Sequence, residues 1–242
     1  MGACCESSDD LRPATAQPGE VARPGKNDEK ITITYFEGGH GRPDPIQQLL
    51  EHKKVPYERR NISQEAWGEK KARGDTGEMG QLPVVVTKGR EMQQTVATLR
   101  ALGVEYGYYN PRDWKAAMAI DMISETENEM FSKFAGIAFF AKEEEKEGAF
   151  NEFKEGGLRK FLNVVEAQLA KNSTNKFLVG EGMTIADFSM ASFLFNCVAN
   201  ENNPYSAQFT DYLLEFPMLG AYSKRLHAEV KNYLDTRAKL PF

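Results

Sequence analysis

Residues 80–102 predict a β-hairpin that runs directly into a helix. A Leu-Pro step opens a β-branched run, because a proline at the first residue of a strand needs no N–H for the sheet. A Lys-Gly pair then supplies the turn, and apolar residues three apart predict the helix. Gln93, Gln94 and Thr95 surround the helix N-terminus, where free backbone N–H groups favour an anion. The stretch therefore indicates either a site for a carboxylate-bearing ligand or an ordinary polar helix start.

The whole chain has 242 residues and a formal net charge of −5, and this length is enough for a full hydrophobic core. The acidic balance argues against nucleic-acid binding, because no basic stripe is available to neutralise phosphates. No apolar run approaches the roughly 18 residues that a membrane span needs. Scattered cysteines and histidines form no disulfide framework and no metal-binding spacing. We therefore expect a cytoplasmic protein without a bound metal or a nucleic-acid partner.

Residues 1–29 predict a disordered tail, because they lack aromatic side chains and are rich in Pro, Gly and charge. Gly2, followed by Cys4 and Cys5, is typical of an N-myristoylated and palmitoylated terminus. Glu6 departs from this pattern, which prefers Ser or Thr there, and no polybasic patch could replace a second acyl chain. Two hypotheses stay open: tethering to the cytoplasmic face of a membrane, and a flexible extension with two incidental thiols.

Residues 30–107 predict an α/β domain that starts with a strand over 31–36. Alternation and β-branching indicate this strand, and a glycine-rich loop follows it. Asp44 and Pro45 are typical of the cap and first turn of a helix, and a second strand is predicted over 55–62. A loose helical connection then leads to the hairpin and helix described above.

Residues 112–242 predict an all-helical domain, since strand patterns stop and long helical patterns begin. The segment 184–200 is apolar nearly all round, which is typical of a helix buried at the centre of a bundle. It opens with Thr184 and Asp187, a capping box in which hydroxyl and carboxylate satisfy backbone donors. The expected fold class is an α/β domain followed by an all-α domain.

Four motifs in this order resemble the cytosolic glutathione transferases: TYF at the end of the first strand, GQLP, QQT and FLVGEGMTIAD. The resemblance covers residues 30–242. It is nearest to the sigma class, with the pi and mu classes close by, because their members use a tyrosine at this strand end. It implies a thioredoxin-like N-terminal domain, an all-helical C-terminal domain, glutathione as co-substrate and a homodimer.

Tyr35 is the catalytic residue that the resemblance implies. Its phenol would donate a hydrogen bond to the glutathione sulfur and favour the thiolate, which is the nucleophile. Without the family context, a strand-end aromatic that fills the core would be the simpler interpretation. The family usually has Arg-Gly-Arg after the tyrosine, whereas here His40 stands in place of the first Arg and the loop is one residue longer. Arg42 is still expected to support the site structurally.

The resemblance also implies a glutathione-binding set within residues 81–95. Leu82 would bind the cysteinyl backbone through its own main chain, with Leu82–Pro83 as a cis peptide, and Gln81 would help to hold the tripeptide. Gln94 and Thr95 match the family pair that holds the γ-glutamyl carboxylate, with Thr keeping the hydroxyl of the usual Ser.

Trp67 and Lys71, four positions apart, match residues that reach the glycyl carboxylate. The following loop looks longer than usual, so Arg73 competes with Lys71, and a surface aromatic–lysine pair is the alternative. Glu129 occupies the position of an acid that reaches across the dimer to the γ-glutamyl amine. Asp121 is the fallback for that role, or a structural acid.

The function implied is glutathione conjugation to small electrophiles, a detoxification activity. The alternatives are a glutathione-dependent isomerase similar to prostaglandin D synthase, and a non-catalytic ligand-binding or structural member of the fold. Tyr35, Gln81, Gln94 and Thr95 together disfavour the structural role, because a packing protein has no chemical need for that set. Tyr108 and Tyr109 could line the electrophile pocket or pack in the linker.

Overall fold

The computed structural model describes residues 30–174, 176–210 and 212–242. Gly2, Cys4 and Cys5 lie outside these ranges, so acylation of the tail stays a prediction. The first part of the fold consists of β1 (Ile31–Phe36), α1 (Asp44–His52), β2 (Tyr57–Ile62), α2 (Gln64–Arg73), β3 (Val84–Thr87), β4 (Arg90–Met92) and α3 (Thr95–Tyr106). The second part consists of α4 (Trp114–Phe140), α5 (Glu143–Phe153), η1 (Lys154–Leu158), α6 (Arg159–Lys171), α7 (Ile185–Phe193), η2 (Leu194–Val198), η3 (Ser206–Gln208), α8 (Tyr212–Glu215), α9 (Pro217–Glu229) and α10 (Lys231–Thr236).

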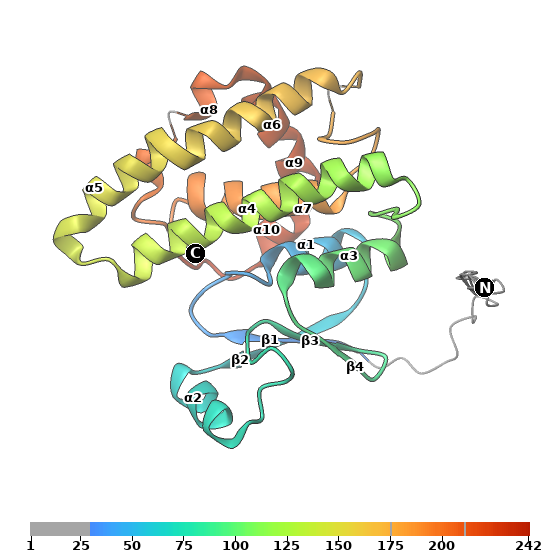
Figure 1. Cartoon of the computed structure of the whole chain (residues 1–242), viewed down its shortest axis with the longest axis vertical. Coiled ribbons are helices and arrows are strands. Elements are labelled where there is room, and N and C mark those ends of the chain that lie inside the picture. The colour runs from blue at the N-terminus through green and yellow to red at the C-terminus, as the bar shows by residue number, and fades with distance from the viewer. Residues whose placement is uncertain (1–29, 175, 211) are drawn as a thin grey trace, which may run out of the picture.

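The four strands form one sheet in the order β2-β1-β3-β4. β1 runs parallel to β2 and antiparallel to β3, and β3 and β4 form the expected hairpin. Helices α1 and α3 lie between the sheet and the helical part, whereas α2 lies on the other side of the sheet (Figure 1). The predicted fold class, a thioredoxin-like part followed by an all-helical part, is confirmed. The linker expected between residues 107 and 112 falls between α3 and α4.

Two predicted element starts differ from the structure for local reasons. β2 begins at Tyr57 rather than at residue 55, directly after Pro56, which has no N–H for a ladder. Asp44 is the first helical residue of α1 and not its cap, and its side chain makes no capping hydrogen bond. That carboxylate is instead drawn into a buried network described below.

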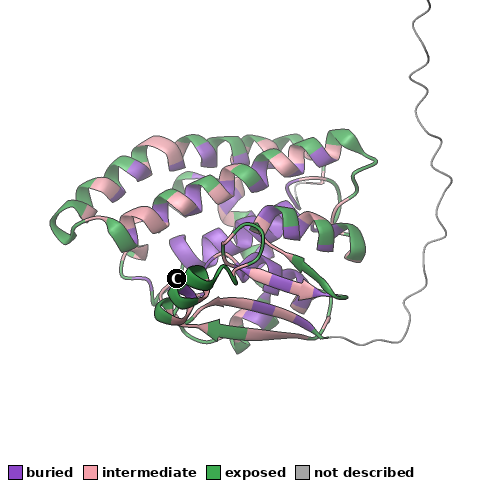
Figure 2. Ribbon diagram, turned by 60° about the horizontal axis from the view of Figure 1, so that its bottom comes forward, coloured by how far each residue is buried: buried purple, intermediate pink, exposed green. Residues whose placement is uncertain are grey.

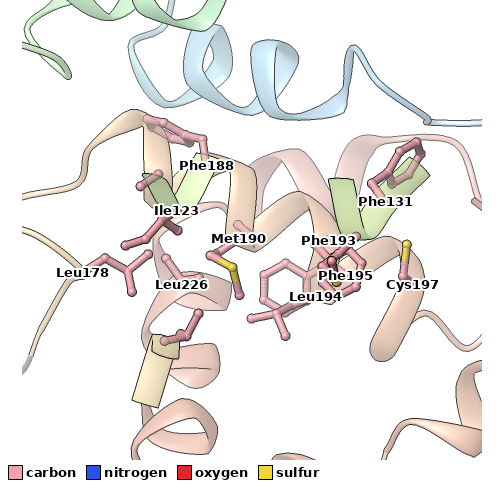
Figure 3. Close-up of a cluster of buried hydrophobic side chains, with 14 of the residues drawn as sticks. Ile123, Phe131, Leu178, Phe188, Met190, Phe193, Leu194, Phe195, Cys197 and Leu226 are labelled. Carbon is pink, nitrogen blue, oxygen red and sulfur yellow. The ribbon is translucent and has the colours of Figure 1, made fainter. Parts of the chain in front are cut away.

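Helix α7 occupies the centre of the helical part, as its composition predicts. Every residue of α7 is buried, and the following π-helical segment η2 is buried too. Buried residues gather in the interior of the molecule (Figure 2). The cluster around α7 includes Phe188, Met190 and Phe193, with Leu226 packed from α9 (Figure 3). The capping box is present: the backbone N–H and hydroxyl of Thr184 both donate to Asp187 Oδ2 at 2.8 Å.

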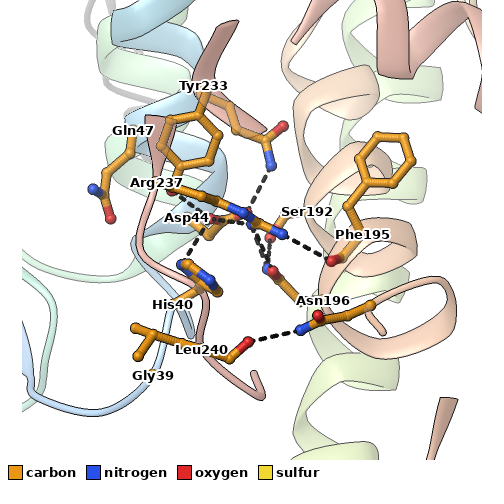
Figure 4. A network of polar contacts seen from close by, with 12 residues as sticks. Gly39, His40, Asp44, Gln47, Ser192, Phe195, Asn196, Tyr233, Arg237 and Leu240 are labelled. Atoms are coloured by element: carbon orange, nitrogen blue, oxygen red, sulfur yellow. Dashed lines mark hydrogen bonds and ion pairs between the residues drawn. The ribbon is translucent and has the colours of Figure 1, made fainter. Parts of the chain in front are cut away.

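The carboxylate of Asp44 joins α1 to the helical part (Figure 4). It is fully buried and accepts hydrogen bonds from Tyr233 Oη at 2.5 Å, Asn196 Nδ2 at 3.0 Å and Arg237 Nη1 at 3.2 Å. A buried charge is tolerated when it is paired and hydrogen-bonded in this way. His40, in the loop that enters α1, is buried beside it, and its backbone N–H donates to the carbonyl of Phe242. The loop after β1 is therefore enclosed between α1 and residues 238–242.

Candidate functional site

Tyr35 lies at the end of β1, on the face of the sheet that carries the buried residues of this strand. Thr34 pairs with Val84 across the antiparallel β1–β3 ladder, so the register brings Leu82–Pro83 alongside Tyr35. The expected cis isomer of Leu82–Pro83 is present. The end of one strand and a loop far from it in sequence therefore meet at one end of the sheet.

The Tyr35 phenol is a hydrogen-bond donor at neutral pH. Burial raises its pKa above the usual range, while a hydrogen bond from the Arg42 backbone and the charges of Arg42 and Arg59 oppose this shift. Gly41 allows the loop to touch the ring: a Cβ there would lie 2.4 Å from Tyr35 Cε1, and its φ is +59°. The phenol is thus held between its loop and β2.

Arg42 ties this loop to α4. It donates to Asn128 Oδ1 at 2.6 Å and to Ser132 Oγ at 2.9 Å, and its Cζ lies 5.6 Å from the centre of the Phe131 ring. These contacts suit the structural support that the sequence predicts for Arg42. His40 does not supply the positive charge of the arginine that it replaces in the family motif, because burial lowers its pKa to about 4 and leaves the imidazole neutral.

The polar residues before α3 are arranged around the helix N-terminus. Gln94 has a φ of +70°, a conformation that is uncommon outside glycine and that tends to occur at functional sites. Its Nε2 donates to Gln81 Oε1 at 2.7 Å. The Thr95 hydroxyl oxygen is buried at the start of α3 without a hydrogen-bond partner. An orphaned hydroxyl beside free helical N–H groups suits the carboxylate that the sequence predicts here.

Gln93 has a function that the sequence did not indicate. Its Nε2 donates at 2.8 Å to the carbonyls of both Thr76 and Gln81, and its Oε1 accepts from the Met79 N–H at 2.7 Å. The side chain thereby closes the long loop before β3 and holds the main chain next to Leu82. The only signal in the sequence was its place as the first glutamine of the QQT motif, of which only Gln94 and Thr95 were matched to a ligand contact.

The two candidates on α2 differ in exposure. Trp67 is buried, whereas Lys71 is exposed one turn later. The competing Arg73 forms an ion pair with Glu69 at 3.7 Å. Arg73 is exposed as well, so exposure does not separate the two cations.

The two acids proposed to reach across a dimer lie on α4. Glu129 is exposed and forms an ion pair with Lys133 at 2.6 Å. Asp121 accepts from Arg100 Nε at 2.8 Å and from Tyr109 Oη at 2.9 Å. Asp121 thus joins α3, the linker and α4, which is the structural alternative stated above.

Both linker tyrosines pack at the joint between the two parts. Tyr108 Oη lies 2.6 Å from His52 Nδ1, and its ring meets that of Phe188 edge to face at 5.0 Å. Tyr109 bonds Asp121. Both tyrosines therefore pack at the joint, and both also line a surface pocket of about 720 Å³ beside it.

Within the described ranges, no group of three or more His, Cys, Asp and Glu side chains could hold a metal ion. None of the helices in that part of the chain is long and apolar enough to cross a membrane.

Comparisons with known proteins identify relatives of this chain. Residues 128–237 match the family model of the glutathione S-transferase C-terminal domain. A glutathione S-transferase of Anopheles gambiae is 31% identical over 164 residues, which is 66% of this chain and 76% of that protein. Glutathione S-transferase 4 of Caenorhabditis elegans is 27% identical over 85% of this chain and 95% of its own length.

Solved structures share the fold at lower identity. Na-GST-3 of the hookworm Necator americanus, described as monomeric, has a TM-score of 0.74 and 22% identity, covering 88% of this chain and 100% of its own. Prostaglandin synthase D of Nilaparvata lugens has a TM-score of 0.70 and 20% identity, covering 86% of this chain and 98% of its own.

Proposed function

The chain belongs to the glutathione S-transferase family, and on this premise we propose that it conjugates reduced glutathione to small electrophiles through a thiolate held by Tyr35. The observation that carries the proposal is the alignment of the protonated Tyr35 phenol with Leu82–Pro83 across the β1–β3 register. A fixed donor that faces developing negative charge is a general source of catalytic rate gains.

We assign the glutathione contacts as follows. Leu82 offers backbone groups to the cysteinyl residue, and Gln81 steadies the peptide. Gln94 and Thr95 hold the γ-glutamyl carboxylate, which is supported by the orphaned Thr95 hydroxyl and by the dipole of α3. Trp67 and Lys71 reach the glycyl carboxylate.

The experiment compares wild type with Tyr35→Phe in a conjugation assay. We expect a loss on the order of 100-fold in kcat/KM, the effect typical of removing one such donor. Thiolate absorbance of bound glutathione should appear near neutral pH in wild type and vanish in the variant. Tyr106→Phe, at the end of α3, is the matched control. Full activity of Tyr35→Phe would refute the assigned role.

We further propose a homodimer that uses the outer face of α4 and α6. Met118, Met122 and Val164 are 52%, 61% and 57% exposed there, and they line a groove of about 730 Å³. Glu129 lines the same groove. A partner seated on this apolar face would meet that carboxylate, which supports a role for Glu129 toward the neighbour's γ-glutamyl amine.

Three finer points stay proposals from the sequence. They are membership of the sigma class, the isomerase alternative, and tethering through acylated Gly2, Cys4 and Cys5. Conversion of prostaglandin endoperoxides by the purified protein tests the isomerase. Membrane partition of wild type and Gly2→Ala tests the tether, and equal partition of the two would argue against it.

A further inference from the structure

Arg59, at the centre of β2, donates hydrogen bonds to the loop after Tyr35 and to the side-chain amides of two nearby residues. The five N–H donors of its guanidinium each have a partner, namely the carbonyls of Phe36 (3.1 Å), Gly39 (2.6 Å) and His40 (3.4 Å), Gln47 Oε1 (2.8 Å) and Asn61 Oδ1 (3.0 Å). Three of these acceptors are main-chain carbonyls of one turn. The guanidinium therefore fixes the path of that loop, which is longer by one residue than the family pattern.

The same guanidinium lies over the Tyr35 ring. Arg59 pairs with Ile33 in the parallel β1–β2 ladder, so both side chains and that of Tyr35 lie on one face of the sheet. Arg59 Cζ is 5.7 Å from the centre of the Tyr35 ring, within the range of a cation–π contact. A fixed positive charge is thus kept next to the phenol.

We propose that Arg59 is a positioning residue for Tyr35: it holds the phenol and its loop in place and extends the activity to lower pH. This inference rests on the proposed function of Tyr35. A cation near the ring favours a negative charge in front of the phenol, so it favours the thiolate over the thiol. The rigid fork of an arginine adds the loop geometry that a lysine could not reproduce.

Other charged and titratable groups around Tyr35 could also change the pH profile, so their effects must be distinguished from that of Arg59. The loop contributes Glu37, Arg42 and the neutral His40, with Asp44 behind it, and β3 contributes none. Helix α4, which Arg42 contacts, contributes Glu127, and burial raises the pKa of this carboxyl to about 8. Because Glu127 titrates in the working range, each pH profile is measured again with Glu127→Gln added.

The test measures kcat/KM from about pH 5.5 to 9 for wild type, Arg59→Gln, Arg59→Lys and Arg60→Gln. Arg60 is the matched control, because it lies next in the same strand, is exposed and pairs only with Glu58 among the described residues. In Arg59→Gln we expect the pKa of the bound thiol to rise by about half to one unit, as removal of a charge at this range predicts. Its activity should then fall about 3- to 10-fold at low pH and recover in part at high pH. Arg60→Gln should match wild type.

Arg59→Lys keeps the charge and loses the fork. We expect a thiol pKa near that of wild type with a lower kcat. A profile of Arg59→Gln that keeps the wild-type midpoint would overturn the proposal, even if its activity were lower at every pH. Glutathione affinity and thermal unfolding are measured for each variant to identify misfolding. If Arg59→Gln misfolds, the kcat of Arg59→Lys decides: a kcat below that of wild type supports the proposal, and a kcat equal to it overturns the proposal. The proposed function fails separately, through an active Tyr35→Phe.

Discussion

The guanidinium of Arg42 donates to Asn128 Oδ1 at 2.6 Å although the two residues are 86 positions apart. Arg42 follows Gly41, which touches the Tyr35 ring, and Asn128 lies within the long helix α4. This single contact therefore couples the loop beside the proposed catalytic residue to the helical part.

Breaking the contact between Arg42 and Asn128 should lower the free energy of unfolding. We expect Asn128→Ala and Arg42→Met each to lower the free energy of unfolding by about 1.5–3 kcal/mol, typical of hydrogen bonds to a charged group. Because they share one interaction, the double variant should lose less than the sum of the two. Urea denaturation measures all four proteins. Strictly additive losses would show that the contact contributes nothing.

Substitution of Gln93 should weaken glutathione binding without changing the chemistry. Gln93→Ala removes three hydrogen bonds that hold the main chain around Gln81, each worth about 1 kcal/mol. KM for glutathione should rise about tenfold while kcat changes little, because Gln93 is not assigned to the reacting atoms. Gln93→Glu should be worse, since it places a carboxylate against two carbonyls. The exposed Gln64→Ala serves as control, and an unchanged KM in Gln93→Ala would refute the role.

Glu127 should make the folded state less stable as pH rises. Burial raises its pKa from 4.5 to about 8, with the Asp44 charge adding to this shift and Arg42 opposing it. The folded protein thus holds a proton that the unfolded chain has released, so this contribution is full below about pH 4.5 and is lost as pH rises toward 8. Glu127→Gln should flatten that slope and raise the unfolding free energy at pH 7 by about 1–3 kcal/mol.

Urea denaturation at several pH values between about 5 and 8.5 measures this slope. Glu129→Gln, on the exposed side of the same helix, is the control and should keep the wild-type slope. If Glu127→Gln also kept it, the carboxyl would not hold a proton at neutral pH.

Met122→Glu should disrupt the proposed dimer. A charge in the middle of the groove between α4 and α6 would have to be desolvated on association. Sedimentation should show a shift toward monomer. The control Leu214→Glu, at another exposed apolar side chain, should leave the mass unchanged. If Glu129 serves the neighbouring site, KM for glutathione should rise with dissociation. A wild-type protein that is already monomeric would refute the dimer.

Local patterns were sufficient to predict the elements that carry the site. Three such patterns act over a few neighbouring positions and can therefore be recognised in the sequence. They are the alternation in residues 31–36, the turn before β4, and the capping box of Thr184 and Asp187. The order of the motifs then predicted the fold class, which is confirmed.

The contacts that shape the site come from residues distant in sequence. The placement of Arg59 over Tyr35 depends on the parallel register of β1 and β2, and the Arg42–Asn128 contact depends on how α4 crosses the loop. Asp44 looked like a helix cap because its neighbours suit one, yet packing of α10 against α1 drew its carboxylate into a buried network. Short-range patterns could therefore predict which helices and strands form. Only the packed chain decides which charges meet, because such pairs leave no periodic trace in the sequence.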